Sequence, residues 1–375
     1  MSKREKPMKL EQFCVFIDEE KKVYYPGETF AGTLHVSLRE QMMVAGISVT
    51  FCGQVKTCWH EGAGEEKKTF TGEEVLFRKS KVLFGNAPTS IEKRTMPGKP
   101  HKAGEFDYNF KFTFPQILPS SFESSFGSIR YYVKGQIHKP GIKLDFITKV
   151  PLTVIDRIDT TEMYCFTRKE DEILQTIGCF GIKSGPVFCK ADIDRGCYIP
   201  GEYIVFNAHV ENHSKKTLKG LKARLDQVVD YFAEDGSGHK ISRKTLVRLK
   251  GPKVYPGETL EWSNQSLQIP ITEPSIHNCS LINIRYVIVI YVDVRCFNNV
   301  CVPFELIVGT IPGHIQSGNV THSYKSIPNA CTVSFNDEQE EVCKITHEVE
   351  YLPAYPYLER TSNKDEKELI VEDLT

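Results

Sequence analysis

Residues 23–34 read VYYPGETFAGTL, and residues 197–206 read CYIPGEYIVF. Each stretch contains a Pro-Gly-Glu triplet, and the two triplets lie 174 residues apart. Pro-Gly predicts a tight turn, because proline presets the backbone of the first corner and glycine accepts a positive φ at the second. The apolar and aromatic residues beside each turn predict strands. The recurrence of the whole pattern indicates a duplicated unit.

Later landmarks support the duplication. The tripeptide Ile-Arg-Tyr occurs at residues 129–131 and again at residues 284–286, which is 155 residues further on. A residue pair ending in proline recurs at residues 114–115 and 269–270 with the same offset. The fall in the offset from 174 to 155 residues implies that the second copy is shorter between its landmarks.

Alternation with a period of two dominates the stretches between turns. Over residues 106–114 five aromatic residues alternate with polar ones, which places all five on one face of a strand. Residues 203–210 and 47–55 alternate in a similar way, and no long stretch has the 3.6-residue period of a helix. We therefore predict an all-β fold with two tandem immunoglobulin-like β-sandwich domains.

Length and composition agree with a globular protein of two domains. The chain has 375 residues, 40% of them hydrophobic and 25% charged. Its first residues, MSKREKPMKLEQ, lack the apolar stretch of a secretory signal, so we expect a cytoplasmic protein. None of the twelve cysteines has CxxC spacing. In the cytoplasm we expect them to stay reduced and to pack as small apolar residues.

The net charge of −1 divides unevenly along the chain. Residues 336–375 contain twelve acidic and four basic residues and so carry −8, which leaves +7 on the rest. A basic body suits acidic lipid headgroups, and hence peripheral membrane association, or acidic peptide segments. The alternative is that the surface lysines only keep the body soluble.

These landmarks together resemble the arrestin family, and within it the α-arrestins, or arrestin domain-containing proteins. The stretches that carry the resemblance are residues 24–38, 96–115, 127–137, 191–202, 254–262 and 282–292. The resemblance implies an arrestin N-like β-sandwich at residues 8–156, a linker at 157–178, an arrestin C-like β-sandwich at 179–311 and a flexible acidic tail at 312–375.

The resemblance implies a non-enzymatic adaptor without a cofactor. Family members bind the cytosolic tails of membrane receptors or transporters and direct them to endosomes, often by recruiting HECT-type ubiquitin ligases. The expected location is the cytoplasm, with recruitment to the plasma membrane or endosomes. A constitutive sorting-coat subunit, similar to the arrestin-fold component of retromer, is the alternative function.

The recruitment motif departs from the family pattern. WW domains of the ligases read PPxY, but this chain contains no Pro-Pro pair. The nearest candidate is LPxY at Leu352, Pro353, Ala354 and Tyr355, in which proline would insert between aromatic rings and tyrosine would fill a neighbouring pocket. The alternative is a hydrophobic tail segment that packs back onto the body.

A second tail motif fits the acidic dileucine pattern that clathrin adaptor complexes read. Asp365 precedes Leu369 and Ile370 at the required spacing, so two aliphatic side chains can fill an apolar pocket while the acid meets a basic rim. The alternative is a solvated charged terminus.

The sequence lacks the familiar signatures of enzymes, metal sites and nucleic-acid binding. GxxxxGK[ST], GxGxxG, GxSxG and HExxH do not occur. His209 and His213 lie four residues apart, and Cys296 and Cys301 five apart, without further ligands at suitable spacing. The basic residues are dispersed, which argues against a nucleic-acid partner. The glutamates of the Pro-Gly-Glu triplets are expected to cap their turns or to pair with nearby bases.

Overall fold

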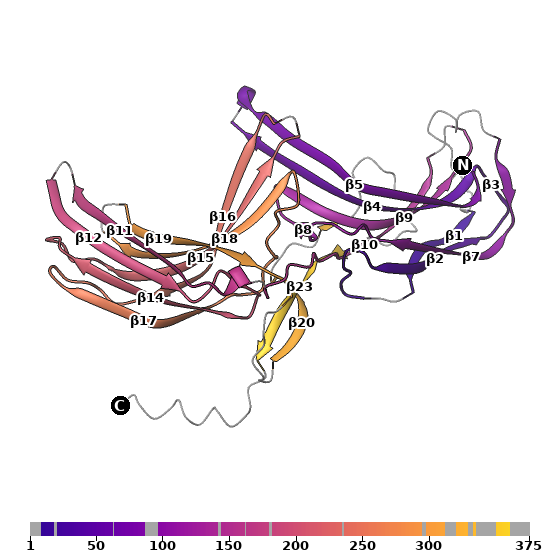
Figure 1. Cartoon of the computed structure of the whole chain (residues 1–375). Coiled ribbons are helices and arrows are strands. Elements are labelled where there is room, and N and C mark those ends of the chain that lie inside the picture. Colours follow the sequence, from indigo (N-terminus) through magenta and orange to yellow (C-terminus); the bar gives the residue numbers. More distant parts are fainter. Residues whose placement is uncertain are drawn as a thin grey trace, which may run out of the picture. The chain divides into compact units, whose positions relative to one another are not determined.

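The computed structural model describes residues 9–360, apart from residues 19–20, 63, 87–96, 142–143, 162, 180–181, 235, 295–297, 312–319, 329–332 and 335–349. The chain divides into two compact units (Figure 1). The first comprises residues 1–156, 232–238 and 329–354. The second comprises residues 157–231, 239–328 and 355–375.

The first unit is built from two antiparallel sheets. One sheet has the order β1-β2-β7, and the other has the order β10-β9-β4-β5, with β8 pairing β9. These strands span Leu10–Ile17 (β1), Thr29–Leu38 (β2), Gly46–Glu61 (β4), Lys68–Gly85 (β5), Gly104–Thr113 (β7), Phe122–Glu123 (β8), Gly127–His138 (β9) and Phe146–Leu152 (β10). Met42–Val44 (β3) pairs with Lys99–His101 (β6).

Aromatic side chains fill the core of the first unit. Phe110, Phe112 and Phe114 are buried, as the alternation over residues 106–114 predicts. Phe51 of the opposite sheet makes an edge-to-face contact with Phe114, with ring centroids 4.8 Å apart. Such contacts add specific geometry to apolar burial and hold the two sheets face to face.

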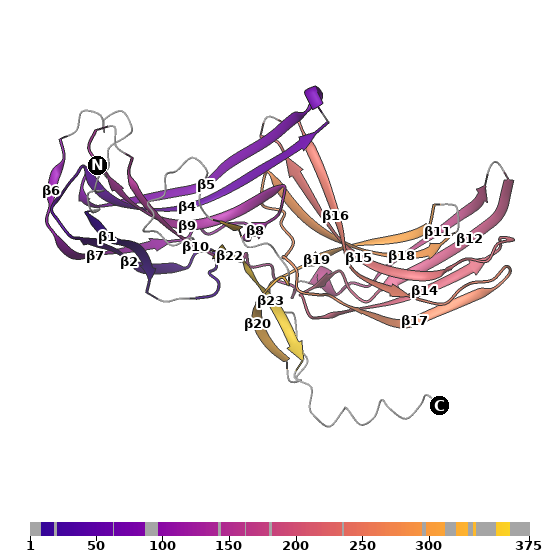
Figure 2. The same ribbon diagram turned by 180° about the vertical axis from the view of Figure 1, so that it is seen from behind.

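The second unit also has two large sheets (Figure 2). One has the order β11-β12-β14-β17 and the other the order β13-β19-β18-β15-β16. Their strands span Lys169–Cys179 (β11), Ile182–Ile193 (β12), Cys197–Tyr198 (β13), Tyr203–Asn212 (β14), Gly220–Phe232 (β15), His239–Lys250 (β16), Thr259–Gln268 (β17), Ile282–Asp293 (β18) and Val300–Val308 (β19). The prediction of two all-β sandwich domains is confirmed.

The glutamates of the Pro-Gly-Glu triplets cap their own turns, as expected. The backbone N–H of Tyr25 donates to Glu28 Oε2 at 3.2 Å, and that of Tyr255 donates to Glu258 Oε2 at 2.7 Å. The N–H of Ile199 donates in the same way to the Glu202 carboxylate, at 2.8 Å. The glycine of each triplet has a positive φ, between 75° and 97°, which an L side chain rarely adopts.

The tyrosines of the two Ile-Arg-Tyr tripeptides make equivalent hydrogen bonds in the two units. The Tyr131 hydroxyl donates to the carbonyl oxygen of Pro119 at 2.6 Å, and the Tyr286 hydroxyl donates to that of Glu273. Both tyrosines are fully buried. The Tyr286 oxygen also accepts a hydrogen bond from Gln227 Nε2 at 2.9 Å. Each tyrosine thereby ties a connecting segment to its sheet from inside the core.

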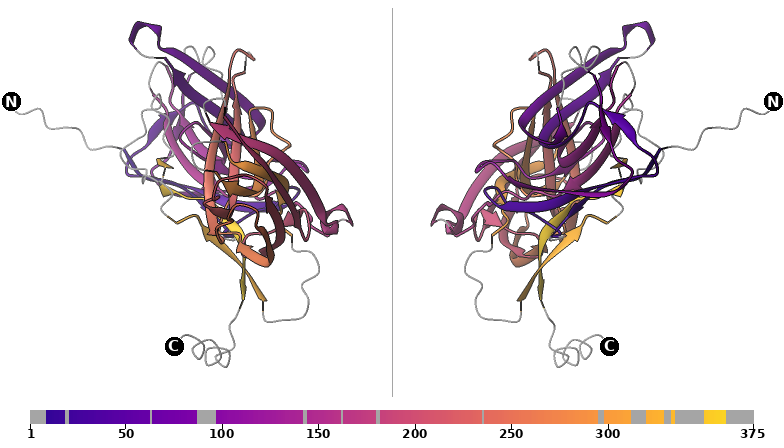
Figure 3. Two further views of the ribbon diagram at one scale, coloured as in Figure 1. Left: turned by 90° about the vertical axis from the view of Figure 1, so that its left-hand side faces the viewer. Right: turned by 90° about the vertical axis from the view of Figure 1, so that its right-hand side faces the viewer.

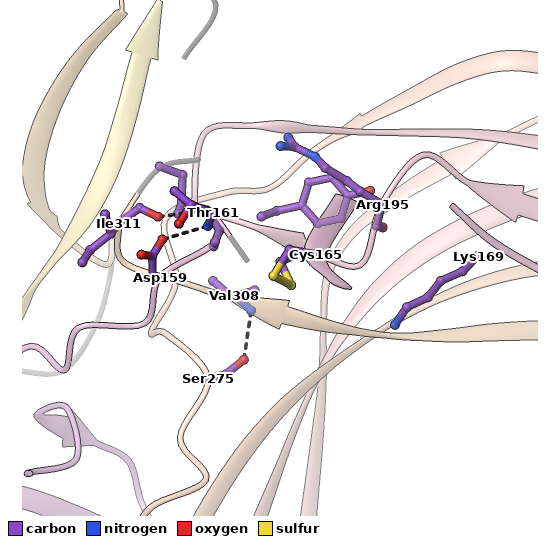
Figure 4. The surroundings of a disulfide bond; sticks show 12 residues. Asp159, Thr161, Cys165, Lys169, Arg195, Ser275, Val308 and Ile311 are labelled. Atoms are coloured by element: carbon purple, nitrogen blue, oxygen red, sulfur yellow. Dashed lines mark hydrogen bonds between the residues drawn. A yellow bond between two sulfur atoms is a disulfide. The ribbon is translucent and has the colours of Figure 1, made fainter. Parts of the chain in front are cut away.

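A disulfide corrects the expectation that the cysteines stay reduced. Cys165 lies in a short 3₁₀ helix, Met163–Phe166 (η3), and is bonded to Cys197 of β13 (Figure 4). Both cysteines are buried, at 1% and 2% exposure. The Gly196 N–H donates to the Cys165 carbonyl oxygen at 3.0 Å, so the backbone already holds the two segments together. Spacing in the sequence does not reveal this proximity, which depends on the fold.

Replacing Tyr286 by phenylalanine is expected to lower the free energy of unfolding of the second unit by about 2 kcal/mol, because buried polar groups lose their partner. The chain has two tryptophans, Trp59 in the first unit and Trp262 in the second. Urea unfolding followed by Trp262 fluorescence in a Trp59→Phe background measures the effect. Tyr255→Phe is the matched control, since Tyr255 is 56% exposed. Equal midpoints for the two variants would contradict the assigned role.

Loss of the disulfide is expected to destabilise the second unit. The bond closes a loop with a sequence separation of 32. Loop-closure entropy predicts that Cys165→Ser/Cys197→Ser lowers the free energy of unfolding by about 3–4 kcal/mol under non-reducing conditions. The Trp262 signal measures this change too. In excess dithiothreitol the parent chain should approach the variant, and an unchanged midpoint would count against a formed disulfide.

Candidate functional site

The segment that carries the candidate WW-domain motif is folded onto the body. Glu350–Tyr351 (β22) pairs with Val333–Ser334 (β21), and Ala354–Arg360 (β23) pairs with Val320–Ser326 (β20). Figure 3 shows β20 and β23 as the orange and yellow strands that lie side by side. The flexible tail expected from residue 312 thus contains four strands that sequence patterns did not indicate, because each is short and lacks a long alternating run.

Tyr351 anchors this segment in the first unit. Its side chain is 5% exposed and packs with Cys52 and Tyr132 in one buried cluster. The Tyr351 hydroxyl donates to the Leu152 carbonyl oxygen at 3.4 Å and accepts from the Thr153 hydroxyl at 3.5 Å. Burial raises the pKa of Tyr351 to about 12. The phenol therefore stays neutral and serves as a packed, hydrogen-bonded anchor.

The following residues are anchored in the second unit. Tyr355 is 2% exposed and Leu358 is 6% exposed. The Leu358 N–H donates to the carbonyl oxygen of Pro200 at 2.9 Å, directly beside the turn glycine Gly201. A Cβ atom on Gly201 would lie 2.2 Å from the Leu358 carbonyl oxygen, so this approach requires glycine. Lys325 of β20 pairs with Glu359 of β23.

The candidate motif residues therefore differ in access. Pro353 and Tyr355, the two residues that a WW domain would grip, are buried. Leu352 and Ala354 are half-buried. This arrangement is the one that the alternative interpretation describes, a tail segment packed onto the body. WW-domain recognition of Leu352–Tyr355 stays a prediction, and it requires β23 to leave its place.

The candidate acidic dileucine motif lies outside the described residues. Asp365, Leu369 and Ile370 all follow Arg360, where the description of the chain ends. Their recognition by a clathrin adaptor complex stays a prediction.

A groove of about 360 Å³ lies beside Tyr351 in the first unit. Its walls come from the end of β1, from β10 and from the tail residues Tyr351 and Leu352. Phe16 stands 52% exposed at this groove, and Lys21 and Lys22 line it. Because two tail residues form part of the wall, the shape of the groove depends on the docked tail.

His209 in β14 and His213, which follows that strand, both lie beside carboxylates. His209 Nδ1 contacts Glu261 Oε1, and His209 Nε2 lies 3.1 Å from Glu211 Oε1. His213 Nε2 lies 2.8 Å from Glu211 Oε2. Hydrogen bonds to Glu211 and Glu261 raise the pKa of His209. Cross-strand register between β14 and β17 creates this cluster, because His209 lies opposite Glu261.

Metal and redox candidates yield no site in the described part of the chain. There, no group of three or more histidine, cysteine or carboxylate residues has metal-binding geometry, and no helix is long and apolar enough to cross a membrane. Cys301 is half-buried, and Cys296 lies outside the described residues. Burial raises the pKa of Cys189 to about 12, so this thiol is not poised as a nucleophile.

Comparisons with known proteins agree with the geometry. Residues 13–161 match the family model "Arrestin (or S-antigen), N-terminal domain", and residues 183–313 match "Arrestin (or S-antigen), C-terminal domain". Arrestin domain-containing protein 4 of Homo sapiens is 28% identical over 303 residues, which cover 80% of this chain and 71% of that protein. Thioredoxin-interacting protein of Homo sapiens is 27% identical over 308 residues, which cover 81% and 76%.

The His209 cluster predicts a pH-dependent contribution to stability. A raised folded-state pKa stabilises the protein fully below the unfolded pKa of about 6.5, and this stabilisation is lost as the pH rises through the folded pKa. Titration of the His209 ring by NMR should give a pKa above 6.5. Glu211→Gln/Glu261→Gln should return it toward the unfolded value, and a parent pKa at or below about 6.5 would refute the assignment.

Proposed function

Because the chain belongs to the arrestin family, in its α-arrestin branch, we propose that it is a non-enzymatic adaptor that links membrane cargo to endosomal sorting. Its cargo would be the cytosolic tails of receptors or transporters. The protein would work in the cytoplasm and move to the plasma membrane or endosomes when cargo is present. The arrestin-type body and the similarity to arrestin domain-containing protein 4 support this proposal.

The observation that supports the proposal is that the candidate LPxY motif lies where β23 begins, in a segment that is packed onto the body. The LPxY sequence begins in the two residues between β22 and β23 and ends in β23. The segment can either pack onto the body or be bound by a partner. This competition is expected for an adaptor that recruits its partner only when the segment is released. HECT-type ubiquitin ligases with WW domains are the proposed partners of this motif, and clathrin adaptor complexes are those of Asp365, Leu369 and Ile370.

Recruitment of a WW domain is proposed to require release of β23. The apparent affinity of the ligase for the whole chain would then be reduced by the fraction of chains in which the strand is released. A peptide of residues 348–360 is free of this constraint. We expect it to bind the same WW domain at least about tenfold more tightly than the full chain does.

Fluorescence-polarisation and pull-down assays against a panel of WW domains and clathrin adaptor complexes test the proposal. Tyr355→Ala should abolish WW binding by both the peptide and the full chain. Tyr357→Ala is the matched control, since Tyr357 lies on the same strand outside the LPxY sequence. Leu369→Ala/Ile370→Ala should abolish adaptor binding. Binding to neither partner class, together with co-purification in a stoichiometric complex, would favour the sorting-coat subunit instead.

A further inference from the structure

Strand β16 of the second unit carries an unusual concentration of positive charge. Its sequence, HKISRKTLVRLK, contains five lysine or arginine residues and a histidine in 12 positions, and no acidic residue. β16 lies at the end of its sheet and pairs with β15 on one side (Figure 1). In the described part of the chain no strand pairs with its outer side. Backbone hydrogen-bonding groups and cations therefore occur together along one edge.

Apart from Lys240, the basic residues of β16 fall into two sets with different surroundings. His239 and Arg243 approach the carboxylates of Asp230 and Asp226, at 2.9 Å and 3.9 Å. Asp226 is fully buried and also accepts a hydrogen bond from the Thr245 hydroxyl at 2.8 Å. This first set pairs with the two aspartates of β15, which also pair with Arg224 and Arg285, and it belongs to the structure of the sheet.

The second set is exposed and lacks acidic partners. Lys244, Arg248 and Lys250 are exposed, and they occupy even-numbered positions, which alternation places on the same side of the strand. Arg248 also donates from Nη2 to the Thr245 hydroxyl at 3.4 Å. Within the described ranges no carboxylate pairs with any of the three. Twelve strand residues extend about 40 Å, so these cations form a line rather than a compact patch.

We propose that the outer edge of β16 binds an extended acidic peptide segment of a partner protein. The peptide would add a strand to β16, and its alternate carboxylates would face Lys244, Arg248 and Lys250. Edge lysines also hinder unwanted pairing between like edges. Two basic edges repel each other, whereas an acidic strand is attracted to a basic edge. The lysines and arginine of β16 therefore select the partner by its charge.

The opposite sheet of the second unit supports this selectivity. Its end strand β11 begins with Lys169 and continues with Glu170, Asp171 and Glu172. Lys190 of β12 pairs with Glu170, which leaves an acidic edge that would repel an acidic peptide. The end strands β11 and β16 therefore differ in sign. The other end strands of these two sheets, β17 and β13, contain no lysine or arginine, so β16 is the end strand of these sheets that carries a row of cations. If the proposed adaptor function holds, the peptide would be a segment of the cargo, yet the surface itself can be tested without any cargo.

The test uses the full chain and a fluorescein-labelled 12-residue peptide in which glutamate alternates with threonine. Lys244→Gln/Arg248→Gln/Lys250→Gln should weaken binding at least tenfold at low salt. Lys102→Gln/Lys111→Gln/Lys215→Gln removes the same charge from exposed positions elsewhere and should change the affinity less than twofold. Equal loss in both variants would show that net charge alone attracts the peptide and would overturn the proposal.

Two further arms separate the alternatives. A peptide with N-methyl groups on every amide of its six central residues keeps its charge but has blocked donors on both edges, so it cannot form a ladder and should bind at least tenfold more weakly. Undiminished binding of this peptide would overturn strand addition. Phosphatidylserine vesicles that bind the parent chain but not the triple variant, without any peptide binding, would assign the surface to lipid. An oligomer dissociated by both the triple variant and Glu170→Gln/Asp171→Gln/Glu172→Gln would assign it to a second copy.

Discussion

Every large sheet in this chain is open, so each one ends in strands whose outer N–H and C=O groups have no partner within the sheet. A single unsatisfied group is costly when buried, and a whole exposed edge invites pairing with another chain. The second unit meets this constraint with charge at two of its end strands: β16 is basic and β11 is largely acidic, whereas β17 has a single glutamate and no lysine or arginine. The remaining end strand of its five-stranded sheet, β13, has only two residues and leaves little edge to protect.

Within each unit, two hydrogen-bonded motifs fix the positions of the connecting segments relative to the sheets. The Pro-Gly-Glu turn uses its own carboxylate to satisfy a backbone N–H, and it does so three times with the same geometry. The buried tyrosine of Ile-Arg-Tyr holds a preceding segment through its carbonyl oxygen in both units. These contacts are specific where apolar packing is not, because a hydrogen bond has a required direction.

Local chemistry explains which features the sequence predicts. Alternation and Pro-Gly turns act over a few residues, so the strands around Phe110 and the turn at Glu202 follow from pattern alone. The contact of Tyr351 with Thr153 joins residues 198 positions apart, and the disulfide partners are separated by 32. The His209–Glu261 pair needs the register of β14 against β17. Such features depend on the folded chain, and no short pattern encodes them.

The tail motif shows why a match to a sequence pattern has to be judged separately from the solvent accessibility of its side chains. Leu352–Tyr355 matches the LPxY pattern, but Pro353 and Tyr355 are themselves buried where the segment packs onto the body. In the proposed recruitment, packing and recognition therefore compete for the same side chains, and a partner that binds Tyr355 has to offset the loss of its contacts. Because Tyr351 and Leu358 flank the motif and contribute their own burial, strengthening either anchor lowers the released fraction without touching the motif. Under the proposed function, substitutions at these flanking residues would change the strength of recruitment while the LPxY sequence stays constant.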